Sequence, residues 1–436
     1  MKHKVLLVGR YNIIEPLGIM TLASVIKEEG HCVDIFLYRQ PDGSDIIPHI
    51  CEGSYDMVGF SCYTGLHKVV YRKALALKGN HKVIIGGPHT TAFMQECSDY
   101  ADYVVVGEGV SSIRGVLNGS IKPGIVFSPY LVAPNHIPVP DRKIVYGNYP
   151  KLKDNPIKSV ITSMGCKFSC DYCYNPAYRK LYPQFKVRQR TVESVVEECV
   201  NLKQYGTKMI FFQDDHFGLD VTWLNDFSKA YKKHVGLPFH CQMRPESISE
   251  GRLKLIKQAG CISITMAIET YNDSVRKYHL GRSGGIDIIK HAGHLVSVWG
   301  LALRTQQMLA LPDTTKEDEL NLLQLNIELQ PAVAWTSIFA PYLGTPLGDW
   351  CKASGWYDGT NDDLDDNFFS NTRLNFDPDR VRFSNMLHRI FATCVKIPHG
   401  LELAKRFLND GALTFDGWYH TVKQLFYDKC LYNMEE

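Results

Sequence analysis

Short apolar runs alternate with stretches of helical periodicity through the first 120 residues. The apolar runs predict five strands, at residues 4–8, 33–37, 57–61, 82–85 and 103–106. Between them, apolar residues recur at helical spacing, which predicts helices at residues 17–29, 45–51, 67–78, 90–96 and 112–117. This alternation is typical of an open parallel sheet covered by helices. Residues 1–120 are therefore expected to form a doubly wound α/β domain that binds its ligand where the strands end.

Residues 121–156 differ from their surroundings because they contain many prolines and glycines and show no periodicity. This composition favours a stiff, extended chain. We expect a linker between two domains here.

A second alternation of strands and helices follows, over residues 157–347. It predicts six strands, at residues 159–162, 209–212, 238–242, 261–267, 301–309 and 335–339. A closed eight-stranded barrel takes about 250 residues, so the shorter segment favours a partial (β/α)6 barrel. Residues 348–436 are expected to form a small helical region, with helices near 378–395, 401–409 and 415–432.

The overall composition limits the possible functions. The 436 residues are 45% apolar, and 48 Lys and Arg against 46 Asp and Glu give a formal charge of +2. A chain this close to neutral lacks the basic field expected of a nucleic-acid-binding protein, so we expect no nucleic-acid partner. No apolar run of about 18 residues is present, so we expect no membrane span and a cytoplasmic location.

Three of the thirteen cysteines fall within eight residues, at Cys166, Cys170 and Cys173. Three thiolates on one short loop can bind a single metal centre. No fourth Cys or His is close enough to complete a zinc site, so the spacing favours an iron–sulfur cluster with one iron left open for chemistry. The alternative is three buried apolar cysteines. We interpret the other ten as core or surface thiols.

The segment Cys166-x3-Cys170-x-Tyr172-Cys173 resembles the signature loop of radical S-adenosylmethionine (SAM) enzymes. The resemblance continues in three strand-end motifs, Phe211-Phe212-Gln213-Asp214-Asp215, Met266-Ala267-Ile268-Glu269-Thr270 and Leu309-Ala310-Leu311-Pro312. Upstream, the motifs Glu15-Pro16-Leu17-Gly18-Ile19, Ile85-Gly86-Gly87-Pro88-His89 and Val106-Gly107-Glu108-Gly109 resemble the cobalamin (B12)-binding branch of that family. The resemblance implies an α/β protein with an N-terminal Rossmann-like cobalamin-binding domain, a partial radical SAM barrel and a helical C-terminal region.

In that family a 4Fe-4S cluster chelates SAM at its open iron, and the resemblance assigns Cys166, Cys170 and Cys173 as the cluster ligands. The residues implied to bind SAM are Tyr172 at the adenine, Arg188 and Arg190 at the carboxylate, Asp214 or Asp215 at the amino group, and Glu269 at the ribose. Each also has a structural interpretation. The paired aspartates can be a helix cap, Glu269 a buried ion-pair partner, and the arginines a solvated face.

The resemblance also implies a cobalamin site on glycine-rich loops, which leave room for a large flat ligand. Its residues are Leu17, Gly18, Ser61, Tyr63, Thr64, Gly86, Gly87, Pro88, His89, Gly107, Glu108 and Gly109. The chain lacks the Asp-x-His-x-x-Gly motif that presents a histidine to cobalt. Cobalt would then face the loop 61–65, with Tyr63 as the nearest candidate and His89 as a weaker one.

The leading hypothesis is a cobalamin-dependent radical SAM methyltransferase that methylates an unactivated carbon through a 5'-deoxyadenosyl radical and methylcobalamin. One alternative is non-methylating radical chemistry, such as cyclisation, ring rearrangement, oxidation or epimerisation. Another is a cobalamin- or redox-sensing binding module. The substrate can be a small molecule, a lipid-like molecule, a tetrapyrrole or a peptide, and flavodoxin or ferredoxin is the expected electron donor. The polar residues expected to face the substrate are Gln242, Arg244, Arg304 and Gln306.

Overall fold

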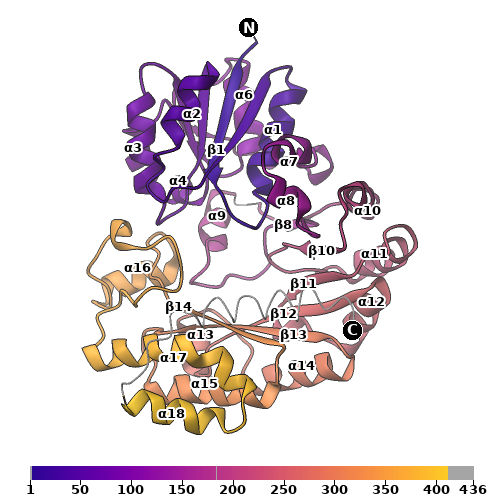
Figure 1. Cartoon of the computed structure of the whole chain (residues 1–436), viewed down its shortest axis with the longest axis vertical. Coiled ribbons are helices and arrows are strands. Elements are labelled where there is room, and N and C mark those ends of the chain that lie inside the picture. The colour runs from indigo at the N-terminus through magenta and orange to yellow at the C-terminus, as the bar shows by residue number, and fades with distance from the viewer. Residues whose placement is uncertain (1, 183, 411–436) are drawn as a thin grey trace. The chain divides into compact units, whose positions relative to one another are not determined.

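The computed structural model describes residues 2–182 and 184–410 of the chain (Figure 1). The chain folds into two compact units, and neither is continuous in sequence. Of the described residues, the first unit contains those up to 155 together with 174–189 and 361–366, and the second contains 156–173, 190–360 and 367–410.

The first unit is built on a six-stranded parallel sheet with the order β2-β1-β3-β4-β5-β6. Its strands are β1 (Lys4–Arg10), β2 (Cys32–Tyr38), β3 (Met57–Ser61), β4 (Lys82–Gly86), β5 (Tyr103–Val106) and β6 (Gly124–Phe127). The chain leaves β1 toward one edge and returns at β3 on the other side, so the strand order reverses between β1 and β3. In sheets of this kind, ligands bind at the carboxyl ends of the strands beside such a reversal.

Helices cover both faces of this sheet because the central strands are apolar on both sides. Residues Val5 to Val8 of β1 are at most 3% exposed. The helices are α1 (Leu17–Glu28), α2 (Ile46–Gly53), α3 (His67–Leu77), α4 (Pro88–Ala92), α5 (Met94–Ser98) and α6 (Gly109–Leu117). On one face, Ile46 of α2 and Val70 of α3 share an apolar cluster with Val58 of β3. The predicted doubly wound sheet is therefore confirmed.

The segment 121–156 contains regular structure, so our prediction of an extended chain without elements is wrong for part of it. It forms β6, the helices α7 (Arg142–Asn148) and α8 (Pro150–Asp154), and one turn of 3-10 helix at Pro134–His136. Strand β6 lies at the sheet edge, and only Val126 of its four residues is buried. Its apolar run, Ile125 to Phe127, is shorter than the four or more residues by which a strand is recognised in a sequence, which is why the pattern did not indicate it.

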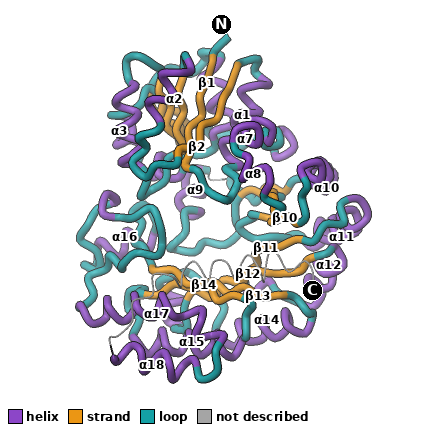
Figure 2. Tube along the Cα trace, in the orientation of Figure 1, coloured by secondary structure: helices purple, strands orange, loops and turns teal. Residues whose placement is uncertain are grey.

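The second unit contains six parallel strands in the order β14-β13-β12-β11-β10-β7 (Figure 2). They are β7 (Ile157–Val160), β10 (Met209–Phe212), β11 (Phe239–Met243), β12 (Cys261–Glu269), β13 (Ala302–Leu309) and β14 (Val333–Ile338). The two ends of this order, β14 and β7, are not paired with each other, so the sheet stays open. The predicted partial (β/α)6 barrel is confirmed.

Helices pack on one face of this open sheet and leave the other face polar. The helices are α10 (Val192–Leu202), α11 (Val221–His234), α12 (Glu250–Ala259), α14 (Ile286–Val298) and α15 (Lys316–Leu329). Along β12, Ile264 and Met266 join the apolar core with the helices. The alternate residues Ser263 and Thr265 hydrogen-bond the ring of His240 from β11 (2.7 and 2.8 Å). This alternation gives the barrel a polar inner face.

The C-terminal region is helical as far as the structure describes it. It contains α16 (Pro346–Ala353), α17 (Pro378–Lys396) and α18 (Gly400–Asp410), which confirms the helices expected near 378–395 and 401–409. The helix predicted at 415–432 lies outside the described residues. Leu387 and Phe391 of α17 are buried in the core of the second unit. None of the described helices is both long enough and apolar enough to cross a membrane.

Candidate active site

The three clustered cysteines lie on the loop that follows β7. Cys166 is buried, whereas Cys170 and Cys173 are half-buried, and none of the three is in a disulfide. The backbone N–H of Cys173 donates to the carbonyl of Cys170 (3.0 Å), which folds this part of the loop into a tight turn. Burial raises the pKa of the Cys166 thiol, and the nearby Asp215 carboxylate raises it further. A bound metal would therefore have to displace this proton.

The donor chemistry of this loop fits an iron–sulfur cluster. Three thiols on one turn are the soft ligands that such clusters require. The Cys170 sulfur also accepts a hydrogen bond from Nη1 of Arg244 (3.5 Å), and such bonds stabilise a thiolate. The residues present are therefore suited to the group that the sequence suggests.

Tyr172, between the second and third cysteines, belongs to a buried three-residue network. Its hydroxyl donates to Oε1 of Glu269 (2.7 Å), and Nη1 of Arg282 donates to both that oxygen (2.8 Å) and the Tyr172 hydroxyl oxygen (2.9 Å). Burial and then the Glu269 charge raise the pKa of Tyr172 well above its ordinary value. Glu269 ends β12 with a positive φ of 72°. A non-glycine residue is strained there, which is common at functional sites.

Arg282 is a residue that the sequence analysis missed. It is 2% exposed and forms the ion pair of this network with Glu269. The segment Gly281-Arg282-Ser283-Gly284-Gly285 gives one weak signal, an arginine among glycines in a loop. Nothing local in the sequence indicates its partners, because Tyr172 is 110 positions away.

The two neighbouring aspartates have different environments. Asp214 is 1% exposed, and its carboxyl accepts bonds from the hydroxyls of Thr162 (2.7 Å) and Ser163 (2.6 Å) and from the Thr162 N–H. Burial raises the pKa of Asp214 to about 6, although these hydrogen bonds lower it. Asp215 is exposed. Asp214 thus anchors the start of the cysteine loop, and Asp215 is the aspartate that a ligand can reach.

Both arginines predicted to bind a carboxylate are held by glutamates of this chain. Arg190 pairs with Glu198 (2.5 Å) and donates to the carbonyls of Ile161 and Ser194. Arg188, in the first unit, forms an ion pair with Glu108 and donates to the carbonyl of Val132. These partners favour the interpretation of the two arginines as structural.

In the first unit, the loops predicted for cobalamin follow β3, β4 and β5. They are closely packed at two glycines with positive φ. A Cβ on Gly87 (φ 122°) would lie 2.6 Å from the Cys62 carbonyl oxygen, and one on Gly107 (φ 73°) would lie 2.2 Å from the Tyr182 hydroxyl. By contrast, a Cβ on Gly18, beside the buried Leu17, would meet no atom within 4 Å. The first two glycines therefore serve internal packing, and Gly18 borders open space.

The loop Ser61 to Gly65 presents one large exposed side chain, that of Tyr63, which is 49% exposed. Ser61 and Thr64 are half-buried beside it. Gly86, Pro88 and Gly109 belong to the neighbouring loops and helix starts, while Glu108 is paired with Arg188. An exposed aromatic beside small residues at the strand ends suits a large flat ligand, so the residues present fit cobalamin.

His89 lies in a buried network. Its ring nitrogens are hydrogen-bonded to Thr64 (2.9 Å) and Tyr71 (2.8 Å), and its ring stacks on that of His67 (4.3 Å between centroids). Burial and then the neighbouring His67 lower the pKa of His89 to about 3. Both nitrogens already have partners, so His89 is poorly placed to bind cobalt or another metal.

The four residues predicted to face the substrate divide into two groups. Arg304 and Gln306 lie on the polar inner face of β13, where the Arg304 guanidinium stacks over Trp335 (4.8 Å). The amide of Gln242 donates to the backbone of Asp214 (3.5 Å). Arg244 instead contacts the cysteine loop, where its Nη1 donates to the Cys170 sulfur (3.5 Å).

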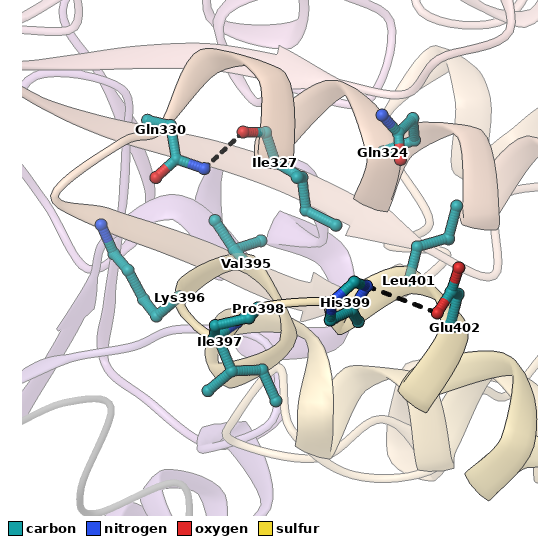
Figure 3. A pocket seen from close by; sticks show the side chains of 11 residues that line it. Gln324, Ile327, Gln330, Val395, Lys396, Ile397, Pro398, His399, Leu401 and Glu402 are labelled. Atoms are coloured by element: carbon teal, nitrogen blue, oxygen red, sulfur yellow. Dashed lines mark hydrogen bonds and ion pairs between the residues drawn. The ribbon is translucent and has the colours of Figure 1, made fainter.

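A cavity of about 450 Å³ lies between α15 and the junction of α17 and α18 (Figure 3). It is lined by Gln324, Ile327, Gln330, Lys396, His399 and Glu402, among others, and none of the predicted site residues is among its lining. Figure 3 shows His399 paired with Glu402 (3.5 Å) at its edge. This cavity borders the helices that cover the barrel, so it is not part of the candidate active site.

Two protein-family models match different segments of this chain. The B12 binding domain family matches residues 3–117, and the Radical SAM superfamily matches residues 160–325. An uncharacterized methyltransferase of Pyrococcus horikoshii is 29% identical over 374 residues, covering 78% of this chain and 79% of that protein. A tRNA-2-methylthio-N(6)-dimethylallyladenosine synthase of Clostridioides difficile is 26% identical over 204 residues, and the chain spans only 41% of its length.

Two solved structures have a similar fold. The radical SAM methyltransferase TsrM of Kitasatospora setae, with tryptophan and aza-SAM bound, has a TM-score of 0.65 at 15% identity, covering 82% of this chain and 77% of that one. The cobalamin-dependent SAM radical enzyme OxsB, with aqua-cobalamin and SAM bound, has a TM-score of 0.67 at 15% identity, covering 94% and 71%. At this identity the likeness shows a shared fold.

Proposed function

Because this chain belongs to the radical SAM enzymes that carry a B12-binding domain, we propose that it is a methyltransferase acting on an unactivated carbon. The cofactors of such an enzyme are a 4Fe-4S cluster, SAM and cobalamin. Bound together, they supply one-electron chemistry that removes a hydrogen atom from the substrate and a methyl group to replace it.

The observation that carries the proposal is the presence of both family domains in one chain, together with a relative named as a methyltransferase. That relative aligns with 78% of the chain, a range that includes more than either domain alone. The fold by itself does not distinguish a methyltransferase from a radical SAM enzyme with another chemistry. TsrM is named as a methyltransferase, whereas the name of OxsB specifies no methyl transfer.

We assign the residues of the second unit to distinct roles. Cys166, Cys170 and Cys173 hold the cluster. The network of Tyr172, Glu269 and Arg282 fixes the loop between the cysteines.

Two further roles follow from exposure and position. Asp215 is the candidate for the amino group of SAM, because Asp214 is buried and already accepts several hydrogen bonds. Glu269 stays our candidate for the ribose hydroxyls. We assign Arg190 to holding the first turn of α10, because Glu198 and two carbonyl groups already take its donors.

In the first unit, we propose that cobalamin lies over the strand ends, with Tyr63 facing cobalt. A tyrosine is a weak ligand, so cobalt would have no strong protein ligand on that side. The polar inner face of the barrel, with Gln242, Arg304 and Gln306, favours a small-molecule substrate with polar groups. A flavodoxin or ferredoxin as electron donor and a cytoplasmic location belong to the same proposal.

The test uses the full chain, reconstituted without oxygen with iron, sulfide and cobalamin and reduced with dithionite. With SAM carrying a deuterated methyl group, we expect release of both S-adenosylhomocysteine and 5'-deoxyadenosine. A replacement of Cys166 by serine should abolish the 5'-deoxyadenosine. The same replacement of Cys199, a buried cysteine on α10, is the matched control and should retain it.

Each other outcome contradicts the proposal in a different way. Release of 5'-deoxyadenosine without S-adenosylhomocysteine from a cobalamin-loaded preparation would indicate non-methylating radical chemistry. No cleavage of SAM by a preparation with a full cluster would indicate a sensing module.

A further inference from the structure

The guanidinium of Arg244 lies against the cysteine loop. Its Nη1 is 3.5 Å from the Cys170 sulfur, and its carbon Cζ is 4.0 Å from the centre of the Phe168 ring. Arg244 is 7% exposed, so this contact is largely shielded from water. A charge near a thiolate acts more strongly where water is excluded.

Glu246 fixes the orientation of this guanidinium. Its two carboxylate oxygens accept from Nε (3.1 Å) and Nη2 (2.8 Å) of Arg244, which leaves Nη1 directed at the sulfur. The backbone N–H of Gly284 donates to Oε1 of Glu246 (3.2 Å). A Cβ at Gly284 would lie 2.6 Å from that oxygen, so a larger residue there would displace the carboxylate. The Arg244 guanidinium is thus held in this orientation before any cofactor binds.

A second arginine, Arg282, contacts the same loop through a hydroxyl group. Arg282 contacts the hydroxyl of Tyr172 and the carboxylate of Glu269, so its hydrogen bonds go to oxygen. Arg244 directs an N–H at a sulfur that is a proposed cluster ligand. Hydrogen bonds to the sulfurs and nearby charge are two factors that set the reduction potential of an iron–sulfur cluster.

We propose that Arg244 is a positioning residue that raises the reduction potential of the bound cluster through an N–H···S hydrogen bond to Cys170. The inference rests on the cluster assignment of the proposed function. Reduction adds one electron from the donor protein to the cluster and breaks no bond at Arg244. The added negative charge is stabilised by the guanidinium, so the reduced cluster gains more from this contact than the oxidised one. Glu246 both orients Arg244 and partly offsets its charge.

The experiment is a redox titration of the reconstituted full-length enzyme without SAM, monitored by the EPR signal of the reduced cluster. The variants are Arg244→Gln and Glu246→Gln, and iron and sulfide content is measured for each. The matched control is Arg380→Gln. It removes an arginine of similar burial in the same unit, whose guanidinium donates to Glu319 (2.8 Å), Ser384 and Thr314 rather than to the cysteine loop.

We expect Arg244→Gln to lower the equilibrium constant for cluster reduction about tenfold, which is about 59 mV for one electron. Glu246→Gln keeps an acceptor oxygen for Arg244 but removes the negative charge, so its potential should rise. Arg380→Gln should match the wild type. A merely structural Arg244 would not give opposite shifts at equal cluster content.

The proposal is overturned if Arg244→Gln and Glu246→Gln both keep the wild-type potential, or if both shift in the same direction. If the Arg244→Gln variant assembles no cluster, the Glu246→Gln variant becomes the test. An unchanged reduction potential in Glu246→Gln then refutes the proposed role of Arg244. A wild-type chain that assembles no cluster would instead refute the proposed function, so the two failures can be told apart.

Discussion

Replacement of Asp214 by asparagine tests the electrostatic role of the buried carboxyl under the cysteine loop. Burial raises the pKa of Asp214 to about 6 in the folded chain, against 3.8 for an ordinary aspartate. The folded state therefore binds this proton more tightly than the unfolded state does. The free energy of unfolding should then fall as the pH rises through this window, because ionising the buried carboxyl disfavours the folded state.

The size of the effect follows from these two values. The difference between 3.8 and about 6 corresponds to about 3 kcal/mol, since a tenfold change in proton affinity is about 1.4 kcal/mol. Roughly half of this change falls between pH 5 and pH 7.5. An asparagine side chain carries no charge at either pH, so the Asp214→Asn variant should gain about 1.4 kcal/mol relative to wild type over that interval.

Urea unfolding followed by tryptophan fluorescence measures this difference in the second unit alone. The sequence has six tryptophans, and none lies within the segments of the first unit. The chain would be kept reduced and free of metal, at pH 5 and at pH 7.5. Asp215→Asn is the matched control because it makes the same replacement at the exposed neighbour. If the difference between wild type and Asp214→Asn is equal at both pH values, the reasoning is refuted.

Three further predictions concern packing, ion pairing and cobalt. Gly107→Ala should lower the free energy of unfolding of the first unit by about 1–3 kcal/mol more than Gly119→Ala does, because both glycines have positive φ but only a Cβ at Gly107 would clash with a tyrosine hydroxyl. Hydrogen exchange of residues 3–117 measures this difference, and equal losses of stability would contradict the prediction. Arg190→Met should lower the free energy of unfolding by about 3–5 kcal/mol, because it leaves Glu198 buried without its arginine. A variant with wild-type stability and a changed affinity for SAM would instead indicate that Arg190 binds SAM. His89→Gln should leave the EPR spectrum of bound cob(II)alamin unchanged, because the hydrogen bonds of His89 keep it from cobalt; loss of a nitrogen splitting would show it to be a ligand.

The sequence predicts most strands because they are buried on both faces or alternate clearly. Strand β6 is not predicted because its apolar run, Ile125 to Phe127, is too short to mark a strand, and only Val126 of its four residues is buried. Helix α13 (Asp273–Tyr278) escapes it because six residues carry too little periodicity to detect. Burial against the rest of the unit, which no local pattern records, decides such short elements.

The candidate site is predictable only where its chemistry is local in sequence. The three cysteines meet this condition because they share one loop. Asp214 and Asp215 are identical neighbours in the sequence, and only the fold separates a buried anchor from an exposed side chain. Arg244 is 74 positions from Cys170, so spacing gives no reason to expect its contact with the cysteine loop.

The interrupted sequence of the first unit has a consequence for synthesis on the ribosome. Residues up to 155 emerge early, but the segment that packs against Gly65 arrives with Asp365, roughly 200 residues later. At translation rates of about 5–20 residues per second, this delay is roughly 10–40 s. During that time the loop after β3 lacks its final neighbour. The nascent chain therefore has to complete its proposed cobalamin-binding surface after most of the barrel has been translated.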